Sequence, residues 1–566
     1  MPASARLILV AAILATALVG TPASAQPVPD GYAYSHQWFE STDGTQLHAG
    51  VFLPEDRAED ERHPVILVST PYAAPNGGVT NASGGSLPNM TGPMVRFREL
   101  FSHPSFRDGR YAYVEVDVRG FGGSGGCFGY YLPPEAEDVK VAVEWTATQP
   151  WSTGRVGMWG KSYDSAQQVL ALASDPEGLA ATVIQAPGLS AYTALWMNGV
   201  HYATGRYATT GVYTADDLFP AQNQDTYDSP EYATGAASSF AADPTCRTDG
   251  LARMNVERDR DGDFWQGKEP YKEAAGSDVP TLWSHGFWDA NTKPAHLDIW
   301  ESLTGPKQAW FGQYTHLRGH ENGVGRGQYF LDEAFRFLDR YVREIDVAQQ
   351  DPAVTVQQGD NDGLWRTEEA WPPADAEPWS FDLRPGSYVD EPGNGGYATG
   401  EGHWTVTRPL PHDAHLAGEI ELGLKVETLV PNVNVVAHVY DIDESGAADL
   451  VTRGAMSPGG MGEQEIAFAL YPQDWLFLAG HRIAIRLSGS DDAWFSPGVS
   501  HTDVAVTGGS LTLPLLGCAR QEFVDGGSSD GMRSPFSVNA ATLDGGSVEN
   551  EPPPAQAAPE ACDPAP

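Results

Sequence analysis

The chain contains few cysteines for its length, and they are not arranged for a metal ribbon or a redox pair. Four cysteines occur among 566 residues, and no two stand in a Cys-x-x-Cys spacing. We therefore expect neither a zinc ribbon nor a redox dithiol. An even number of cysteines suits up to two disulfides in an oxidising compartment, with three possible pairings. Because two of the four lie near the C-terminus, we favour Cys518 with Cys562 and Cys127 with Cys246.

Basic residues are also scarce. The chain has 34 Lys and Arg against 75 Asp and Glu, a formal net charge of -41. This charge repels nucleic acid and anionic membranes, so we expect neither as a partner. Hydrophobic residues make up 41% of the chain and aromatic residues 10%, which is enough for a sizeable core. The length of 566 residues predicts two or more domains and leaves the oligomeric state open.

Long apolar runs are missing after the N-terminus. One arginine precedes the apolar run at residues 7–19, and the small residues "ASA" follow at 23–25. This is the plan of a secretory signal peptide, residues 1–25, and its run is short for a membrane span. Later apolar runs end within the length of a strand. We therefore expect a secreted, extracellular protein without membrane contact once the signal is cleaved.

Motifs for nucleotides and metals are incomplete. The glycine-rich "GFGGSGG" at 120–126 lacks the Gly-Lys-Ser/Thr of a phosphate loop. The "GKS" at 160–162 would need a glycine at position 155, which is Arg155. The acidic "DRDGDFW" at 259–265 lacks the glycine and glutamate of an EF-hand, and we interpret it as a connector whose aromatic residues line a pocket. No metal or cofactor is predicted.

What the chain does contain, from about residue 32 to 345, is an alternation of buried-type strands and amphipathic helices. Several strands are apolar throughout, as strands covered on both faces are. Helices are predicted at Ala136–Thr148 and Tyr329–Ile345. This alternation predicts a mostly parallel α/β sheet. The predicted strands are "PVILVST" (64–70), "YAYVEVDV" (111–118), "RVGMWG" (155–160), "ATVIQA" (181–186), "VPTLWSHG" (279–286) and "QAWFGQ" (308–313).

Two segments depart from this alternation. The stretch at about 191–275 has no clear buried strand, and we interpret it as a helical cap inserted over the sheet. From 351 to 520, short alternating strands separated by Gly, Pro, Asp and Asn predict a β-sandwich or jelly roll. Its predicted strands include "PAVTVQQG", "WTVTRP", "IELGLKVETL", "VNVVAHVYDI", "EIAFAL", "HRIAIRLSG" and "GSLTLPLL". The remaining 525–566 is a Pro- and Gly-rich tail.

Three polar residues follow strands of the predicted parallel sheet. Ser162 comes just after the strand at 155–160, Asp289 after 279–286 and His316 after 308–313. In such a sheet, ligands bind at the carboxyl ends of the strands, so these side chains should meet. The chain order Ser, Asp, His is that of the nucleophile-elbow hydrolases. His320 remains a rival to His316.

The serine itself lies between a strand and a helix, where small neighbours such as Gly160 permit a sharp turn. That turn exposes the hydroxyl and aims the first N–H groups of the helix at a bound acyl group. We expect His316 to take the proton of Ser162. The backbone N–H of Tyr163 and the phenol of Tyr72 are the predicted donors to the oxyanion.

Five segments together are similar to those of a known family: "GKSYDS", "STPY", "DVRGFGGSGG", "HGFWDANTK" and "GQYTH". They resemble the Xaa-Pro dipeptidyl-peptidase and cocaine-esterase-like serine hydrolases. The resemblance implies an α/β-hydrolase domain, a helical cap and a C-terminal, galactose-binding-like jelly roll. It implies Ser162 as nucleophile, Asp289 as acid, His316 as base and Tyr72 as oxyanion donor. The chain departs from the family at Ser165, where a glycine is usual, and at 313–314, where Gln-Tyr replaces Pro-Trp.

Three functions are compatible with these residues. The first is a peptidase that removes Xaa-Pro dipeptides, which needs a carboxylate for the substrate ammonium. The second is a cocaine-esterase-like enzyme, or an amino-acid ester hydrolase or acylase, whose flat acyl groups would suit the aromatic cap. The third, a non-catalytic secreted binding protein, fits poorly with an intact catalytic set. The candidate carboxylates are Asp164, Asp216 and Asp217, and the cap aromatics are Tyr192, Trp196, Tyr202 and Tyr207.

Overall fold

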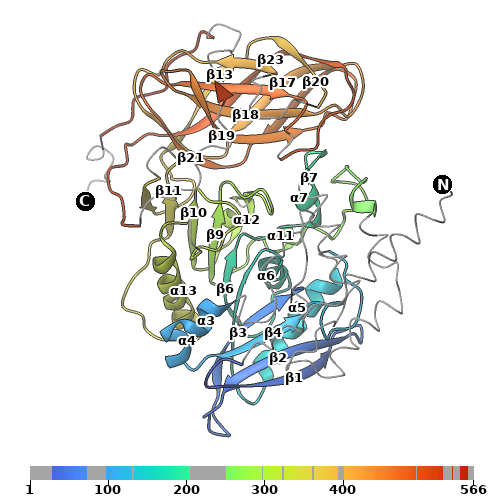
Figure 1. Cartoon of the computed structure of the whole chain (residues 1–566), viewed down its shortest axis with the longest axis vertical. Coiled ribbons are helices and arrows are strands. Elements are labelled where there is room, and N and C mark those ends of the chain that lie inside the picture. Colours follow the sequence, from blue (N-terminus) through green and yellow to red (C-terminus); the bar gives the residue numbers. More distant parts are fainter. Residues whose placement is uncertain are drawn as a thin grey trace, which may run out of the picture.

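The structure is a computed structural model (Figure 1), and most of the chain can be described from it. The described residues are 28–72, 97–130, 133–203, 250, 252–295, 297–321, 324–359, 363–392, 401–491, 494–526, 538–539 and 548–558. The predicted signal peptide, most of the predicted cap and part of the tail lie outside them. Cys127 and Cys518 are each disulfide-bonded. Because Cys246 and Cys562 lie outside the described residues, the pairing stays a prediction.

The first unit is built on a ten-stranded sheet in the order β1-β2-β4-β3-β5-β6-β9-β10-β11-β12. Pairing is parallel from β4 through β11 and antiparallel at both ends. All six predicted strands are present in it, which confirms the expected mostly parallel sheet. The strands are β1 (Tyr32–Glu40), β2 (Gln46–Pro54), β3 (His63–Thr70), β4 (Ala112–Asp117), β5 (Ser152–Lys161), β6 (Leu179–Gln185), β9 (Thr281–Gly286), β10 (Lys307–Gly312), β11 (Val354–Gln357) and β12 (Trp365–Glu368).

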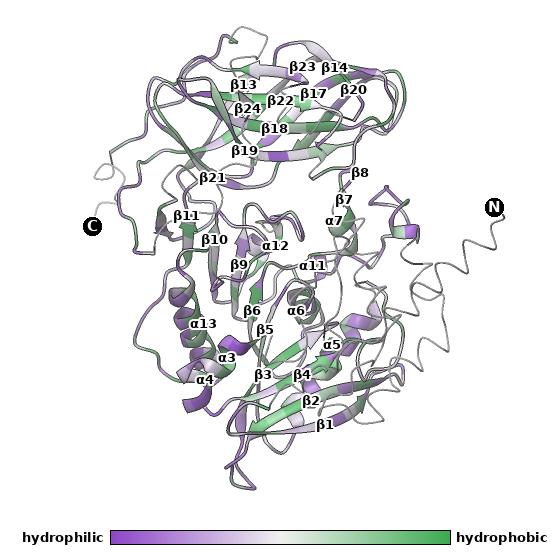
Figure 2. Ribbon diagram, in the orientation of Figure 1, coloured by the Kyte–Doolittle hydropathy of each residue, from purple (hydrophilic) through white to green (hydrophobic). Residues whose placement is uncertain are grey.

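Helices cover both faces of this sheet, which explains its continuous apolar strands. In β3, Val65 and Leu67 pack with one set of helices, whereas Ile66 and Val68 pack with the other. Figure 2 shows green, hydrophobic strands at the centre and mixed colouring on α13, as expected of an amphipathic helix. On one side lie α5 (Pro133–Thr148), α6 (Tyr163–Ser174) and α12 (Leu297–Ser302), and on the other α3 (Arg98–Ser102), α4 (Pro104–Asp108) and α13 (Gly327–Tyr341).

The strand "PAVTVQQG" belongs to this sheet, and its predicted place in the sandwich is wrong. Strand β11 pairs in parallel with β10, with Ala309 opposite Val354, and β12 extends the sheet by one further strand. All four residues of β11 are buried. A short buried strand carries no signal that tells which of two sheets it joins. The hydrolase sheet therefore continues past the expected boundary at residue 351.

The second unit is a β-sandwich, as predicted. Its seven-stranded sheet has the core order β20-β17-β23-β16-β21, with β13 and β14 also paired to β23, and faces a five-stranded sheet in the order β15-β22-β18-β19-β24. Hydrophobic side chains from both sheets form one core between them. The strands are β13 (Ala376–Asp382), β14 (Gly386–Val389), β15 (His403–Val406), β16 (Ala414–Gly418), β17 (Glu421–Thr428), β18 (Val435–Ile442), β19 (Ala447–Met456), β20 (Gly462–Ala469), β21 (Gln473–Phe477), β22 (Arg482–Ser488), β23 (Asp503–Leu516) and β24 (Val538–Asn539).

Only the two ends of the predicted cap are described. Its beginning holds α7 (Ala191–Leu195) and the short hairpin β7 (Trp196–Met197) and β8 (Val200–His201), and its end holds α11 (Pro270–Glu273). Residues 204–249 lie outside the description, so the helical character of that part stays a prediction. Among the described helices, none has the length and hydropathy needed to cross a bilayer.

Candidate active site

Ser162 occupies a strained turn between strand β5 and helix α6. Its backbone has φ 64° and ψ -123°, a conformation that costs a non-glycine residue about 1–3 kcal/mol. Gly160 permits the turn, because a Cβ there would lie 2.5 Å from the Cβ of Asp164. Ser162 is partly exposed at the carboxyl end of a central strand. This is the placement that a nucleophile needs.

Ser165 stands where the resembling family has a glycine, and its hydroxyl has a defined place. The Oγ atom donates to the Gly160 carbonyl over 2.7 Å and accepts from the Gln185 N–H over 2.8 Å. Ser165 therefore ties the nucleophile turn to the neighbouring strand β6, and the departure from glycine does not open the turn.

The end of β6 holds the three predicted catalytic loops together. The Gln185 carbonyl accepts from the Ser162 N–H over 3.0 Å, and the Gln185 side chain accepts from the Gly319 N–H, near the base, over 3.2 Å. Thr292, in the acid loop, lies 3.0 Å from the Ala186 carbonyl. Neighbouring parallel strands thus bring Ser162, Asp289 and His316 to one edge of the sheet.

Asp289 is fully buried and is contacted by two histidines. Its Oδ2 atom lies 2.8 Å from His316 Nδ1, 3.2 Å from His285 Nε2 and 2.8 Å from Thr292 Oγ1. Its Oδ1 atom accepts from the N–H groups of Asn291 and Thr292. Burial alone would raise the pKa of the Asp289 carboxyl. The charge of His316, together with hydrogen bonds from His285 and His316, instead holds that pKa well below its usual range. The carboxylate is therefore ionised and fixed in orientation.

His320, the rival base, has a different environment. Its Nε2 atom lies 3.7 Å from Glu99, and its ring stacks on Phe330. Burial lowers the pKa of His320 to about 3 and raises the pKa of the Glu99 carboxyl. His320 is therefore neutral near pH 7. Of the two histidines, His316 is the one hydrogen-bonded to Asp289.

Tyr72 and Tyr163 flank the nucleophile in different ways. The phenol oxygen of Tyr72 lies 3.5 Å from Ser162 Oγ. The backbone N–H of Tyr163 is in the first turn of α6, while its phenol donates to the buried Glu135 over 2.7 Å. Burial raises the pKa of the Glu135 carboxyl to about 7, against the effect of that hydrogen bond. Ser162 and His316 are both described, and no hydrogen bond joins them here; such bonds often tighten only when substrate binds.

An aromatic wall adjoins Tyr72. The predicted cap residues Tyr192 and Trp196 pack there with Phe264 and Trp265 of the segment 259–265. Asp164, a predicted partner for a substrate ammonium, has 0% exposed surface in helix α6. Tyr207, Asp216 and Asp217 lie outside the described residues. Tyr202 lies instead against the sandwich, hydrogen-bonded to Tyr471 and stacked on Phe495.

Several residues around the site carry no signal in the sequence. His285 and Thr292 contact Asp289 only because β9 and the following loop fold back over it. Lys293 is buried, donates to the carbonyls of Ala194 and Asn291, and has its pKa lowered to about 7 by burial. Within the described ranges, no three His, Cys, Asp or Glu side chains are grouped as metal ligands.

The fold, with a serine at the turn between a parallel strand and a helix, is that of an α/β hydrolase. The family model of X-Pro dipeptidyl-peptidase (S15 family) matches residues 43–318, and that of the X-Pro dipeptidyl-peptidase C-terminal non-catalytic domain matches residues 346–524. The chain belongs to this family of serine hydrolases.

Relatives in sequence carry both peptidase and esterase names. A putative Xaa-Pro dipeptidyl-peptidase of Streptomyces avermitilis is 24% identical over 442 residues, which cover 70% of this chain and 60% of that protein. The chain thus spans less than two thirds of that relative. A putative serine esterase of Mycobacterium bovis is 22% identical over 606 residues, 85% of this chain and 94% of that one.

Solved structures share the whole architecture. A CocE/NonD family hydrolase from Staphylococcus aureus has a TM-score of 0.67 and 16% identity, covering 88% of this chain and 99% of that one. An α-amino acid ester hydrolase has a TM-score of 0.62 and 18% identity, with 88% and 99% coverage. At these identities the similarity establishes the fold.

Proposed function

We propose that the protein hydrolyses an acyl bond through a covalent intermediate on Ser162. The observation that carries this proposal is the hydrogen bond of 2.8 Å between His316 Nδ1 and Asp289 Oδ2, at the same sheet edge as the strained Ser162 turn. Asp289 fixes the tautomer of His316, so that Nε2 is left as the base, and stabilises the imidazolium that forms.

In the proposed first step, Ser162 Oγ attacks the substrate carbonyl carbon while His316 Nε2 takes the hydroxyl proton. The oxyanion forms beside the Tyr72 phenol and the Tyr163 backbone N–H, which stabilise its charge. His316 then donates the proton to the leaving amine or alcohol. Water attacks the acyl-enzyme with His316 again as base, which releases the acid and restores Ser162.

For the substrate, we propose an Xaa-Pro dipeptide at a free N-terminus, supported by both family models and by the named function of the Streptomyces avermitilis relative. An esterase acting on flat acyl groups is the alternative. It is favoured by the full burial of Asp164, which leaves that carboxylate without an accessible surface for an ammonium group.

Ser162→Ala tests the chemistry. We expect this variant to lose hydrolysis of both alanyl-prolyl anilide and a phenyl ester, whereas Ser174→Ala, at a serine bonded within α6, keeps both activities. Full activity of Ser162→Ala on both substrates would remove the assignment. The wild-type enzyme then separates the substrates, because a peptidase prefers the free N-terminus and an esterase also accepts N-blocked esters.

We also propose that the protein is exported, on the strength of the signal-like residues 1–25. Expression of the full chain in a bacterial host with a Sec pathway should place a shortened protein outside the cytoplasm. An uncleaved protein retained inside the cells would contradict export.

A further inference from the structure

Trp288 and Gln313 lie shortly before Asp289 and His316 in the chain, at the contact between the hydrolase unit and the sandwich. Trp288 directly precedes Asp289, and Gln313 is three residues before His316. The Trp288 indole N–H donates to Gln313 Oε1 over 2.8 Å. One side-chain hydrogen bond therefore joins the acid loop to the base loop.

The backbones of these two loops also touch. The Trp288 N–H donates to the Tyr314 carbonyl over 3.1 Å, and the Phe287 N–H donates to the Gly312 carbonyl over 2.8 Å. Gly286 permits this approach, because a Cβ there would lie 2.0 Å from the Tyr314 carbonyl oxygen. These contacts hold the acid loop against the base loop. The Gln313 side chain takes part in them and is buried, with 5% of its surface exposed.

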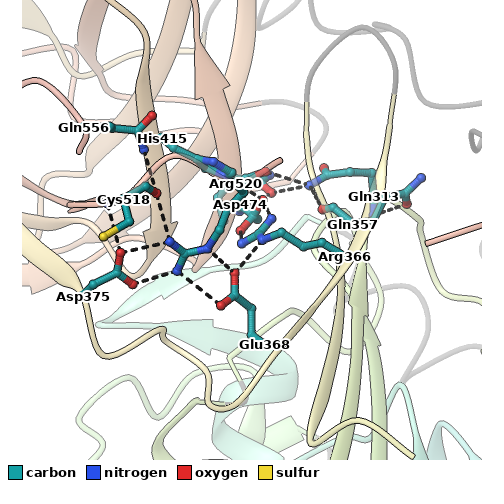
Figure 3. Close-up of polar contacts among 11 residues, drawn as sticks. Gln313, Gln357, Arg366, Glu368, Asp375, His415, Asp474, Cys518, Arg520 and Gln556 are labelled. Carbon is teal, nitrogen blue, oxygen red and sulfur yellow. Dashed lines mark hydrogen bonds and ion pairs between the residues drawn. The ribbon is translucent and has the colours of Figure 1, made fainter. Parts of the chain in front are cut away.

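The other end of the Gln313 amide points into the sandwich. Its Nε2 atom donates to Gln473 Oε1 over 2.7 Å and to the Asp474 carbonyl over 3.1 Å, and it also contacts the Gln357 carbonyl of β11 at 3.2 Å. The Gln357 side chain accepts from the Gln313 N–H over 2.9 Å. Figure 3 shows Gln313 and Gln357 beside the cluster around Asp474.

The sandwich end of this contact is held firmly. Asp474 accepts from two nitrogens of Arg366 over 2.8 and 2.6 Å and from His415 over 3.0 Å (Figure 3). Burial would raise the pKa of Asp474, but the charges of Arg366 and His415 lower it to about 2. The β21 strand is thereby fixed to β12 of the hydrolase sheet.

Trp288 is held by the sandwich as well. Its ring packs in a hydrophobic cluster whose other buried members all belong to the sandwich, Trp404 and Tyr440 among them. Arg453 lies over the same ring at 5.8 Å. The residue that precedes the catalytic acid is thus packed against the second unit.

We infer that Gln313 is a positioning residue, through which strand β21 of the sandwich sets the relative placement of Asp289 and His316. This inference rests on the proposed function of that pair. Gln313 touches no reacting atom; it acts by holding the acid and base loops at a fixed separation.

Gln313→Met tests the inference, because methionine keeps the length of the side chain and removes its hydrogen bonds. We expect kcat to fall about 10- to 100-fold with KM changed less than about threefold, since a small misplacement of catalytic groups is costly. Weaker contact with Asp289 destabilises the imidazolium, so the acid limb of the kcat/KM profile should move to lower pH. Gln473→Met should do the same to a smaller extent.

The double variant Gln313→Met/Gln473→Met should be no worse than Gln313→Met alone, because Gln473 acts through Gln313. Gln556→Met is the matched control. Gln556 lies in the same interface but bonds to the Leu516 and Cys518 carbonyls, so its loss should leave kcat and the pH profile unchanged. Active-site titration with a fluorophosphonate corrects each kcat for the fraction of folded enzyme.

A measurement without substrate separates this inference from the proposed function. The proton shared by His316 and Asp289 should give a downfield NMR resonance in the wild type and in Gln556→Met, and it should move upfield in Gln313→Met. An unchanged resonance and pH profile in Gln313→Met would overturn the positioning role even if the enzyme is active. If Ser162→Ala kept both activities and the resonance still changed in Gln313→Met, only the proposed chemistry would be overturned.

Discussion

The Nδ1 atom of His316 lies 2.8 Å from Oδ2 of Asp289, a carboxylate with no exposed surface. His285 Nε2 approaches the same oxygen at 3.2 Å. One buried charge therefore serves two imidazoles, and only that of His316 is partly exposed, with 20% of its side-chain surface accessible. Solvent can therefore reach His316, whereas the His285 side chain is fully buried.

Asp289→Asn should reduce kcat about 10⁴-fold, because the amide cannot fix the tautomer of His316 or stabilise its charged form. Since the pKa of Asp289 is held well below its usual range, the carboxylate stays ionised throughout the working pH range, and the acid limb of the wild-type profile reports another group. Asp332→Asn breaks a remote histidine–aspartate contact on α13 and should keep full activity. Equal losses in the two variants would indicate a general folding defect.

Tyr72→Phe should lower kcat about 100-fold, corresponding to about 3 kcal/mol of transition-state stabilisation, with little change in KM. The substitution removes the Tyr72 hydroxyl near Ser162 Oγ, while the ring keeps its packing in the aromatic wall. Tyr111→Phe provides the comparison, because its phenol bonds to Asp339 away from the site. Steady-state kinetics on the phenyl ester measures both variants, and a wild-type kcat in Tyr72→Phe would exclude the oxyanion role.

Ser165→Ala should lower the free energy of unfolding by about 1–3 kcal/mol, since the buried Gln185 N–H and Gly160 carbonyl each lose a partner. Ser174 lies nine residues further along α6 at a partly buried position, and Ser174→Ala should lower the free energy of unfolding by less than about 0.5 kcal/mol. Urea denaturation measures both values. A loss in Ser165→Ala no larger than in Ser174→Ala would show that the hydroxyl bridge is unimportant.

His320→Gln should keep its catalytic activity and change the response to acid. The folded-state pKa of His320, about 3, is depressed below that of the unfolded chain, about 6.5. The unfolded chain therefore binds the extra proton, and stability falls as the pH drops from about 6.5 toward 3. Denaturation curves between pH 7 and 4 should show a flatter decline in His320→Gln than in the wild type or in His501→Gln, at an exposed site. If His320→Gln lost activity, His316 would not be the sole base.

The sheet and the serine turn could be predicted because their signals are local. The six strands appear in the sequence as short runs rich in apolar residues, several of them apolar throughout. The turn at Ser162 is marked by the small residue Gly160 between a strand and a helix. Asp289 and His316 each come shortly after a predicted strand, and the structure has both residues beyond the ends of those strands.

The contacts that support these residues could not be predicted, because they join segments far apart in the chain. In the sequence, His285 looks like any residue of the buried strand β9. Gln313 looks like an ordinary polar residue at the end of strand β10. Gln313 meets Gln473 across 160 positions of sequence, through strand pairings that no local pattern encodes. The same limit explains why β11 was expected in the sandwich.

Strand β11 also bears on how relatives of this protein can diversify. The C-terminal family model begins at residue 346, yet β11 and β12 after it complete the sheet that carries the nucleophile. A genetic crossover near residue 346 would join β10 of one parent to β11 and β12 of another parent. These strands would then have to pair although they did not evolve together. Exchange of sandwiches between relatives should therefore be tolerated better when the junction falls after Glu368, because the whole hydrolase sheet then comes from one parent.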